Sequence, residues 1–446
     1  MASVVLSFVG NQDPVSQATE EEGSVVTLLR HLIAQGNVIK RVLLLYTTGT
    51  AVKAQETKNW LASQPALSQV PVELIPTSEV LSQDPTDLLE AAQEARRGLE
   101  QARQILAEGD RLEFNASSGT PAMKSSFSIL QAAGYAPEST VWQVRNPHEM
   151  QEGQSRVFAT DVSGLRREFE LKVFRSQVAN SNFDGAWELF RSVADYFSQK
   201  DAIESYLMAG KLWQRSKLEE FKTGIDAWLT EEQRSYSRQW YFPAYEEAYL
   251  SIVRCRQGNV VEAFFHSFRA FEGILASWGK QIFGEHVVAE GGKILLKKSI
   301  FNERDKFFAN AKYKQNGKPD NDIAKLEEKI RQSEEEHYLL DFAVLCKFFR
   351  SLRQEYKEQC PEIKDLLTNE VSKTRNAIVH QLLGLQEEEL YRAWGTENRD
   401  NWERRLLTCL NFIAQQSFRE WDEASLMAHF YHKLTEAITQ GLPDFG

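Results

Sequence analysis

The feature that most constrains the fold of this chain is a change in its hydrophobic pattern near residue 170. Before that point, short apolar runs alternate with stretches in which apolar residues recur at helical spacing. The runs that predict strands are Ala2–Val9, Arg41–Tyr46, Val70–Ile75, Leu112–Phe114 and Ser139–Val144. The helices expected between them are Ser24–Gln35, Ala51–Ser63, Pro85–Ala107 and one that starts at Pro121 and stops at Gly134. This alternation predicts a mostly parallel sheet covered by helices on both faces.

Beyond residue 170 the pattern predicts helices and almost no strands. Apolar residues at helical spacing occur in Trp187–Phe197, Tyr245–Arg256, Val260–Trp278, Leu339–Arg353, Lys373–Leu383 and Trp402–Ile413. Just before them, Arg156–Leu171 alternates between apolar and polar residues and is expected to form a hairpin that closes the first domain. We therefore predict a Rossmann-like α/β domain over residues 1–172, a helical connector over 173–240 and an all-α domain over 241–446.

The charge balance excludes one class of function. The 446 residues include 52 Lys and Arg against 63 Asp and Glu, which gives a formal net charge of −11. A protein that coats nucleic acid needs a broad basic face to release counterions, and this acidic composition argues against one. A nucleic-acid site confined to one cleft is compatible with the same charge.

The N-terminal residues, the apolar runs and the cysteines indicate the cellular compartment and whether a metal is bound. The first ten residues lack a basic region and are typical of a strand, and no apolar run approaches the about 20 residues that span a bilayer. Cys255, Cys346, Cys360 and Cys409 stand far apart, with no CxxC pair and no histidine at ligand spacing. Neither a disulfide framework nor a zinc site is expected from this spacing. We expect a cytoplasmic protein with no membrane partner and no bound metal.

Small polar residues follow three of the expected strands, as Gly10–Asp13, Thr47–Thr50 and Asn115–Thr120. In a parallel sheet, the carboxyl ends of the strands near the switch point form the ligand crevice. Hydroxyls, amides and glycine N–H groups suit phosphate or ribose oxygens. No GxGxxG follows the first strand, which disfavours a nicotinamide dinucleotide. For any one of these loops, an ordinary turn or helix cap remains the alternative.

The sharpest signal in the helical half is Arg375-Asn376 followed by His380. An Arg-Asn pair with His at this spacing is expected by chance about 0.02 times in a chain of this composition, and it occurs once. On an ideal helix, Arg375 lies in an apolar stripe, whereas Asn376 and His380 share another face. Arg375 and His380 are about 140° apart, so they do not converge within one chain. A symmetric dimer with two facing copies of the motif removes this difficulty.

Both halves of the chain resemble known families. Asn115–Met123, which follows a strand and opens a helix, resembles the signature loop of CARF domains, and Phe8–Pro14 resembles their first-strand loop. The helical half, with Arg375, Asn376 and His380 late in it, resembles a HEPN ribonuclease domain. A CARF domain followed by a HEPN domain is the architecture of the ancillary ribonucleases of type III CRISPR systems.

The resemblance implies a homodimer with a cyclic oligoadenylate sensor in residues 1–172 and a HEPN ribonuclease in residues 241–446. It implies no cofactor and no metal, and a cyclic tetraadenylate activator is expected over a hexaadenylate. The residues expected to line the ligand are Gly10, Asn11, Asp13, Thr48, Asn115, Ser117, Ser118, Gly119, Thr120 and Met123. Slow cleavage of the ligand by the CARF domain is left open.

The chemistry expected of the motif needs no metal, because RNA carries its own nucleophile, the 2′-OH. We assign His380 to proton transfer or to orienting the 2′-OH, Arg375 to the phosphate and Asn376 to orientation. The substrate is then single-stranded RNA. The alternative from another class is a non-catalytic CARF-type regulator that acts through its helical domain, although no helix-turn-helix with a basic recognition helix is evident.

Two other patterns in the helical half have weaker interpretations. Between Lys293 and Lys318, basic residues interleave with aromatic residues, a pattern that suits single-stranded RNA. The aromatic residues are Phe301, Phe307, Phe308 and Tyr313. A solvated loop is an equally good interpretation of that segment. His266 lies among four phenylalanines and is expected to be a packed or interface histidine.

Overall fold

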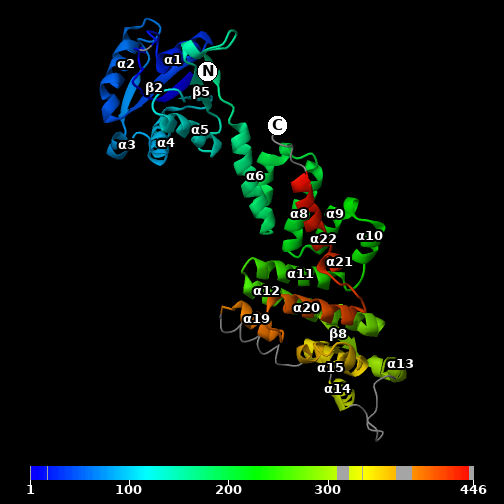
Figure 1. Ribbon diagram of the computed structural model, residues 1–446. Coiled ribbons are helices and arrows are strands. Elements are labelled where there is room, and N and C mark those ends of the chain that lie inside the picture. Colours follow the sequence, from blue (N-terminus) through cyan, green and yellow to red (C-terminus); the bar gives the residue numbers. More distant parts are fainter. Residues whose placement is uncertain (1, 18, 309–320, 334, 368–383, 441–446) are drawn as a thin grey trace. The chain divides into compact units, whose positions relative to one another are not determined.

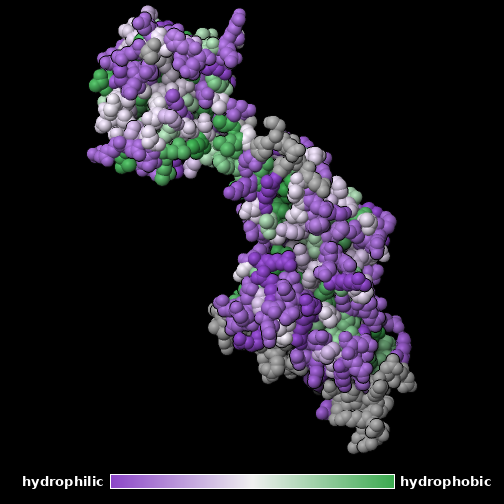
Figure 2. Space-filling view, in the orientation of Figure 1, coloured by the Kyte–Doolittle hydropathy of each residue, from purple (hydrophilic) through white to green (hydrophobic). Residues whose placement is uncertain are grey.

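The computed structural model describes residues 2–17, 19–308, 321–333, 335–367 and 384–440 (Figure 1). The chain divides into two compact units, Met1–Val173 and Phe174–Gly446. The visible surface of both units is mostly hydrophilic, with scattered apolar side chains (Figure 2). Such a surface is ordinary for a folded domain, whose large apolar side chains lie mainly inside.

The N-terminal unit is built on a six-stranded sheet. Its strands are β1 (Ala2–Phe8), β2 (Val38–Tyr46), β3 (Val72–Pro76), β4 (Arg111–Asn115), β5 (Thr140–Val144) and β6 (Val157–Ala159). The spatial order is β3-β2-β1-β4-β5-β6. The first five are mutually parallel, and β6 pairs antiparallel with β5. The strand order reverses between β1 and β4, so the switch point of this sheet lies there.

Helices cover both faces of the sheet, as the hydrophobic pattern predicts. They are α1 (Ser24–Ala34), α2 (Ala51–Ser63), α3 (Glu79–Gln83), α4 (Leu88–Ile105) and α5 (Pro121–Ala132). Leu6 and Phe8 belong to a core cluster with residues of α4 and α5, whereas Val5 packs with residues of α1 and α2. A strand buried on both sides is apolar at every position, which is why these strands are continuous apolar runs.

The expected hairpin at Arg156–Leu171 is wrong over most of its length. Only Val157–Ala159 forms a strand, and α6 (Ser163–Ala179) begins shortly after it. Leu171, Phe174 and Val178 recur at helical spacing and are buried. Phe174 and Val178 lie beyond the end of the alternating segment, so the segment by itself does not show the helical period.

The C-terminal unit is largely helical. Its longer helices are α7 (Phe183–Val193), α8 (Lys200–Gln214), α9 (Leu218–Ile225), α10 (Glu231–Ser237), α11 (Phe242–Arg256), α12 (Val260–Phe283), α14 (Asn321–Gln332), α15 (Phe342–Leu352), α19 (Glu387–Ala393), α20 (Arg399–Ala414) and α22 (Leu426–Gln440). Short helices are α13 (Arg304–Phe308), α16 (Tyr356–Gln359), α17 (Ile363–Leu366) and α21 (Trp421–Ala424). Helices α11 and α12 pack along each other; α12 also packs on α15, α19 and α20, while α22 packs on α8.

The expectation of an all-α second half needs a correction, because this unit also contains a small antiparallel sheet. Its strands are β7 (Val287–Glu290), β8 (Lys293–Lys297) and β9 (His337–Leu339). Gly291 and Gly292 join β7 to β8, both with positive φ. A Gly-Gly pair between two short runs is a hairpin signal, but strands this short carry little periodicity of their own.

Candidate functional site

The three polar loops lie at one edge of the N-terminal sheet. They follow β1, β2 and β4, which are parallel neighbours in the sheet, so their carboxyl ends share an edge. The loops after β1 and β4 flank the switch point, where open α/β sheets bind ligands. The topology therefore places Gly10–Asp13 beside Asn115–Thr120, as the sequence predicts.

Asp13 ties these two loops together from inside. Its side chain is 1% exposed and accepts hydrogen bonds from the backbone N–H of Gly10 (3.0 Å) and of Val25 (3.3 Å) and from the hydroxyl of Ser118. Burial raises the pKa of Asp13, opposed by these hydrogen bonds and by the nearby charge of Lys124. A buried carboxylate with three donors positions the loops that a ligand would touch.

Asn115 has a similar internal role at the end of β4. It is fully buried, and its Nδ2 donates to the hydroxyls of Ser7 (3.0 Å) and Ser24 (3.2 Å). Its Oδ1 accepts from the backbone N–H of Ser117 at 3.1 Å, and the Ser117 hydroxyl accepts from the N–H of Val144 at 2.6 Å. These bonds join β1, α1, β4 and β5, so the loop after β4 is held by three neighbouring elements.

Two glycines let the loops approach each other closely. A Cβ on Gly10 would lie 2.9 Å from the backbone nitrogen of Gly119. Gly119 has φ +89° in the left-handed region, and a Cβ there would lie 2.7 Å from Sδ of the buried Met123. Thr120 then caps α5 by accepting from the Met123 N–H at 3.3 Å. Glycine is required at both positions for steric reasons.

The ten expected ligand residues thus fall into two groups. Asp13, Asn115, Ser118 and Met123 are buried and build the loops. Those that reach the surface of the edge, fully or in part, are Gly10, Asn11, Thr48, Ser117, Gly119 and Thr120. Sequence reasoning missed Ser24, Ser82 and Lys124 at this edge. The Ser82 hydroxyl accepts from the Thr48 backbone N–H at 3.2 Å. The only sequence signal for this contact is that Ser82 follows the strand β3, whose end lies at the same edge.

The catalytic motif expected at Arg375, Asn376 and His380 lies outside the described residues. Its flanks are described, as α17 before it and α19 after it. Helix α19 packs on α12, and Trp394 at its end donates a hydrogen bond to the hydroxyl of Ser267 at 3.0 Å. The assignment of the three motif residues therefore stays a prediction.

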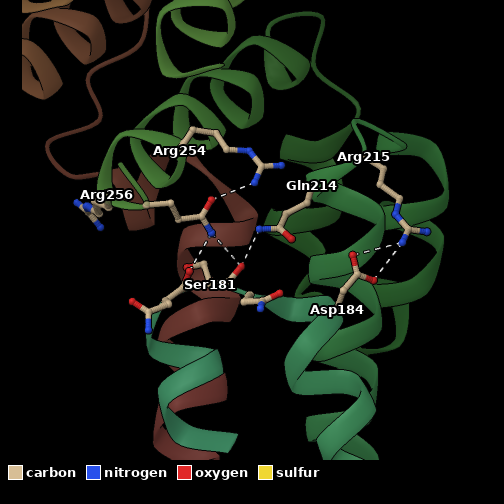
Figure 3. Close-up of a pocket in the computed structure, with 9 residues that line it drawn as sticks. Ser181, Asp184, Gln214, Arg215, Arg254 and Arg256 are labelled. Atoms are coloured by element: carbon tan, nitrogen blue, oxygen red, sulfur yellow. Dashed lines mark hydrogen bonds and ion pairs between the residues drawn. The ribbon is translucent and has the colours of Figure 1, made fainter. Parts of the chain in front are cut away.

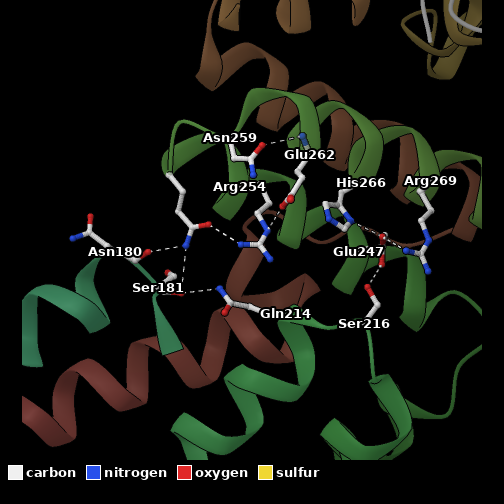
Figure 4. Close-up of polar contacts among 11 residues, drawn as sticks. Asn180, Ser181, Gln214, Ser216, Glu247, Arg254, Asn259, Glu262, His266 and Arg269 are labelled. Atoms are coloured by element: carbon white, nitrogen blue, oxygen red, sulfur yellow. Dashed lines mark hydrogen bonds and ion pairs between the residues drawn. The ribbon is translucent and has the colours of Figure 1, made fainter. Parts of the chain in front are cut away.

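His266 and the basic segment have local partners. His266 Nδ1 lies 2.7 Å from a carboxylate oxygen of Glu247, which also pairs with Arg269 at 3.2 Å (Figure 4). In the basic segment, Phe301 and Phe308 are buried, so they are core residues that cannot stack on RNA bases. Lys312, Lys314 and Lys318 lie outside the described residues. The RNA interpretation is wrong for these two rings, because they are buried in the core, whereas Phe307 is only partly buried and Tyr313 lies outside the described residues.

The described ranges contain neither a metal-binding cluster nor a membrane-spanning helix. In those residues, no group of three or more His, Cys, Asp or Glu side chains is placed to hold a metal ion. No helix in the same ranges is both long and apolar enough to cross a bilayer.

The fold of the chain is similar to that of a known protein over nearly its whole length. No family model matches the chain, and no curated protein matches it. Among solved structures, Enterococcus italicus Csm6 bound to cyclic hexa-2′-fluoro-hexa-dAMP is similar, with a TM-score of 0.68 and 15% sequence identity. The match covers 98% of this chain and 100% of that chain. Over nearly its whole length, the chain therefore has the fold of Enterococcus italicus Csm6.

Proposed function

We propose that this protein is a cyclic oligoadenylate-activated endoribonuclease that cleaves single-stranded RNA in CRISPR antiviral defence in the cytoplasm. The observation that carries the proposal is the fold likeness, over both units, to a protein solved with a cyclic ligand of six nucleotides. The CARF-like loops and the HEPN-like Arg375-Asn376 and His380 pattern agree with it. Residues 1–172 would then be the sensor, 173–240 the connector and 241–446 the ribonuclease.

The carboxyl edge of the N-terminal sheet has the chemistry to bind such a ring. Asn11 and Thr48 are exposed there, and Gly10 and Gly119 allow a ligand close to the backbone. Backbone N–H groups, hydroxyls and an amide suit phosphodiester and ribose oxygens. The ring of the structural neighbour has six nucleotides, whereas we expect a tetraadenylate, so both rings are to be assayed.

An apolar surface at the same edge supports a homodimer. Val52, Val80, Leu88 and Leu89 are 71%, 56%, 47% and 67% exposed. They lie near the starts of α2, α3 and α4, the helices that follow β2 and β3. Exposed apolar side chains near one edge of a domain are suited to an interaction surface. A second copy covering them would also bring two sets of ligand loops to one ring.

The cleavage step follows from RNA itself. The 2′-oxygen attacks the adjacent phosphorus, the bond to the 5′-oxygen breaks, and that oxygen takes up a proton. His380 would move one of these protons or orient the 2′-OH, Arg375 would stabilise the charge on the phosphorane oxygens, and Asn376 would orient the other groups. The products are then a 2′,3′-cyclic phosphate and a 5′-hydroxyl, without a metal ion.

The test is cleavage of an unstructured RNA in EDTA, with cyclic tetraadenylate, cyclic hexaadenylate or neither, by wild type and His380→Ala. We expect ring-dependent cleavage that EDTA does not inhibit, with cyclic phosphate ends, and none in His380→Ala. Loss of activity in EDTA, or full activity of His380→Ala, would contradict the mechanism. Ring binding without cleavage under any condition would favour the non-catalytic regulator, and chromatography of the ring afterwards tests its slow cleavage.

A further inference from the structure

The C-terminal unit contains a polar pocket of about 550 Å³ that the ribonuclease motif does not explain. It lies where three turns meet, namely Asn180–Asn182 between α6 and α7, Gln214–Arg215 at the end of α8, and the end of α11 (Figure 3). We call it the arginine pocket, because Arg215, Arg254 and Arg256 line it. Its lining contains no apolar residue.

Amide side chains build the walls of the arginine pocket. Gln257 Nε2 donates to the carbonyl of Asn180 at 2.8 Å. Gln214 Nε2 donates to the carbonyl of Ser181 at 2.7 Å (Figure 4). Ser181 has φ +52°, a left-handed conformation that is uncommon for a residue other than glycine. The three turns are thus tied together by amide groups, and Gln257 Oε1 also accepts from Arg254 Nη1 at 3.0 Å.

The lining itself is cationic, with three guanidinium groups against the carboxylate of Asp184. Asp184 is shared, because it pairs with Arg215 at 3.0 Å and with Lys211 at 3.4 Å. Arg254 pairs with Glu262 at 2.9 Å and Arg256 with Glu403 at 3.1 Å, and both of these carboxylates lie outside the lining.

The arginines keep donors for a ligand. Each guanidinium has five N–H groups, and the ion pairs at Arg215 and Arg256 engage a single nitrogen of each. Their side chains are 57% and 50% exposed. A pocket rich in donors complements oxyanions, and a volume of this size exceeds what one phosphate group fills. The ligand class that fits is a phosphodiester chain.

A second, smaller pocket adjoins the arginine pocket. Its volume is about 70 Å³, it shares Asn180, Ser181, Arg256 and Gln257 with the arginine pocket, and it adds the partly exposed Tyr431 to the lining. Its other tyrosine, Tyr249, is 6% exposed and packs on Trp213, so it is a core residue. Arginine next to an accessible aromatic ring, here Tyr431, suits single-stranded RNA, through phosphate contacts and base stacking.

With their partners counted, Lys211 and the three arginines exceed Asp184, Glu262 and Glu403 by one positive charge. In a chain of net charge −11, this small local excess favours contact with an RNA strand.

We infer that the arginine pocket is a second contact site for the single-stranded RNA substrate, separate from the residues that cut it. This inference rests on the proposed function for the identity of the RNA. It assigns a binding role to the C-terminal ends of α8 and α11, which lie in the connector and in the ribonuclease region. A cyclic oligoadenylate shares the phosphodiester chemistry, and a competition arm of the test separates it from linear RNA.

The test measures binding of a fluorescent, unstructured 20-nucleotide RNA to the full chain carrying His380→Ala, over a range of salt concentrations. Arg215→Gln with Arg256→Gln should weaken binding roughly tenfold and flatten the salt dependence by about 1.4 in log-log slope, the loss of two phosphate contacts. The matched control is Arg234→Gln, another arginine in ion pairs, with Asp226 and Glu231, outside the pocket. It should bind as the parent does.

Three results would overturn the assignment. In the first, the double variant binds RNA with unchanged affinity and salt dependence. In the second, the control Arg234→Gln loses as much RNA affinity as the double variant. In the third, cyclic tetra- or hexaadenylate displaces the RNA from the parent, and the double variant no longer binds the ring. Failure of the proposed function gives a different result. A wild-type chain that never cleaves RNA, but whose RNA affinity falls in the double variant, contradicts the ribonuclease and leaves the pocket assignment intact.

Discussion

Each unit of the molecule contains a fully buried carboxylate that joins distant segments, and the two differ in what surrounds them. Glu246 on α11 accepts from the Trp213 indole (2.9 Å), the Ser425 hydroxyl (2.9 Å) and the backbone N–H groups of Leu426 (2.6 Å) and Met427 (3.4 Å). It therefore caps α22 from within a helical core. Asp13 has three donors but lies under exposed loop residues.

Because of these different surroundings, we expect Glu246 to affect stability alone and Asp13 to affect both stability and ligand binding. Burial raises the pKa of both groups, and Lys124 opposes the shift at Asp13, whereas hydrogen bonds alone oppose it at Glu246. A change at Glu246 should therefore act on the folding of the helical unit. A change at Asp13 should also act on the ligand edge, because Gly10 and Ser118 are held by it.

The largest effect is expected for Glu246→Ala. It leaves four donors without an acceptor in a site where the parent side chain is 0% exposed, and it should lower the free energy of unfolding by about 4 kcal/mol. Urea denaturation followed by circular dichroism measures this. Glu220→Ala, which removes an exposed carboxylate 3.9 Å from Lys217, should cost less than about 1 kcal/mol. Equal losses in both variants would contradict the buried cap.

The second effect is a pH dependence. Burial raises the pKa of Glu246 from 4.5 to about 7, so the folded chain holds a proton that the unfolded chain has already released. The stabilisation is present below pH 4.5 and is lost as the pH rises to 7, by about 3 kcal/mol. Stability of wild type relative to Glu246→Gln should fall over that window and level off above it. A flat difference would contradict the raised pKa.

The third comparison concerns two glycines of the N-terminal unit. Gly119 and Gly109 have similar φ values, +89° and +83°, but a Cβ at Gly109 meets nothing within 4 Å. Gly109→Ala should cost about 1 kcal/mol for the backbone alone, and Gly119→Ala about 2 kcal/mol more because of Met123. Thermal unfolding of both variants measures the difference. Equal costs would show that the loop after β4 can relax.

The smallest stability effect separates the two groups of ligand-edge residues. Asn11 is exposed, so Asn11→Ala should change stability by less than about 0.5 kcal/mol while weakening binding of the cyclic ring. Asp13→Asn should lower both stability and ring binding, since an amide cannot accept from all three donors. Calorimetric titration with the ring, alongside unfolding, distinguishes them. Unchanged ring binding in Asn11→Ala would remove that residue from the site.

Much of the N-terminal unit could be predicted, because strands that are buried on both faces of a sheet appear in the sequence as continuous apolar runs. Val42–Leu45 is 0% exposed throughout, and the polar residues after such runs mark the ligand edge. The burial of Asp13 and Asn115 could not be predicted, since it depends on hydrogen-bond partners that the fold brings from Val25, Ser118 and Ser7. Local pattern likewise could not show that Phe301 and Phe308 are core residues, or that three short strands interrupt the helices.

The most direct test of the account is the initial rate of RNA cleavage in EDTA as cyclic tetra- or hexaadenylate is added. We expect a saturable rise for one ring, shifted to higher ring concentration in Asn11→Ala and absent in His380→Ala, which still binds the ring. A rate that does not depend on either ring, or a His380→Ala chain that cleaves as wild type does, would contradict the account.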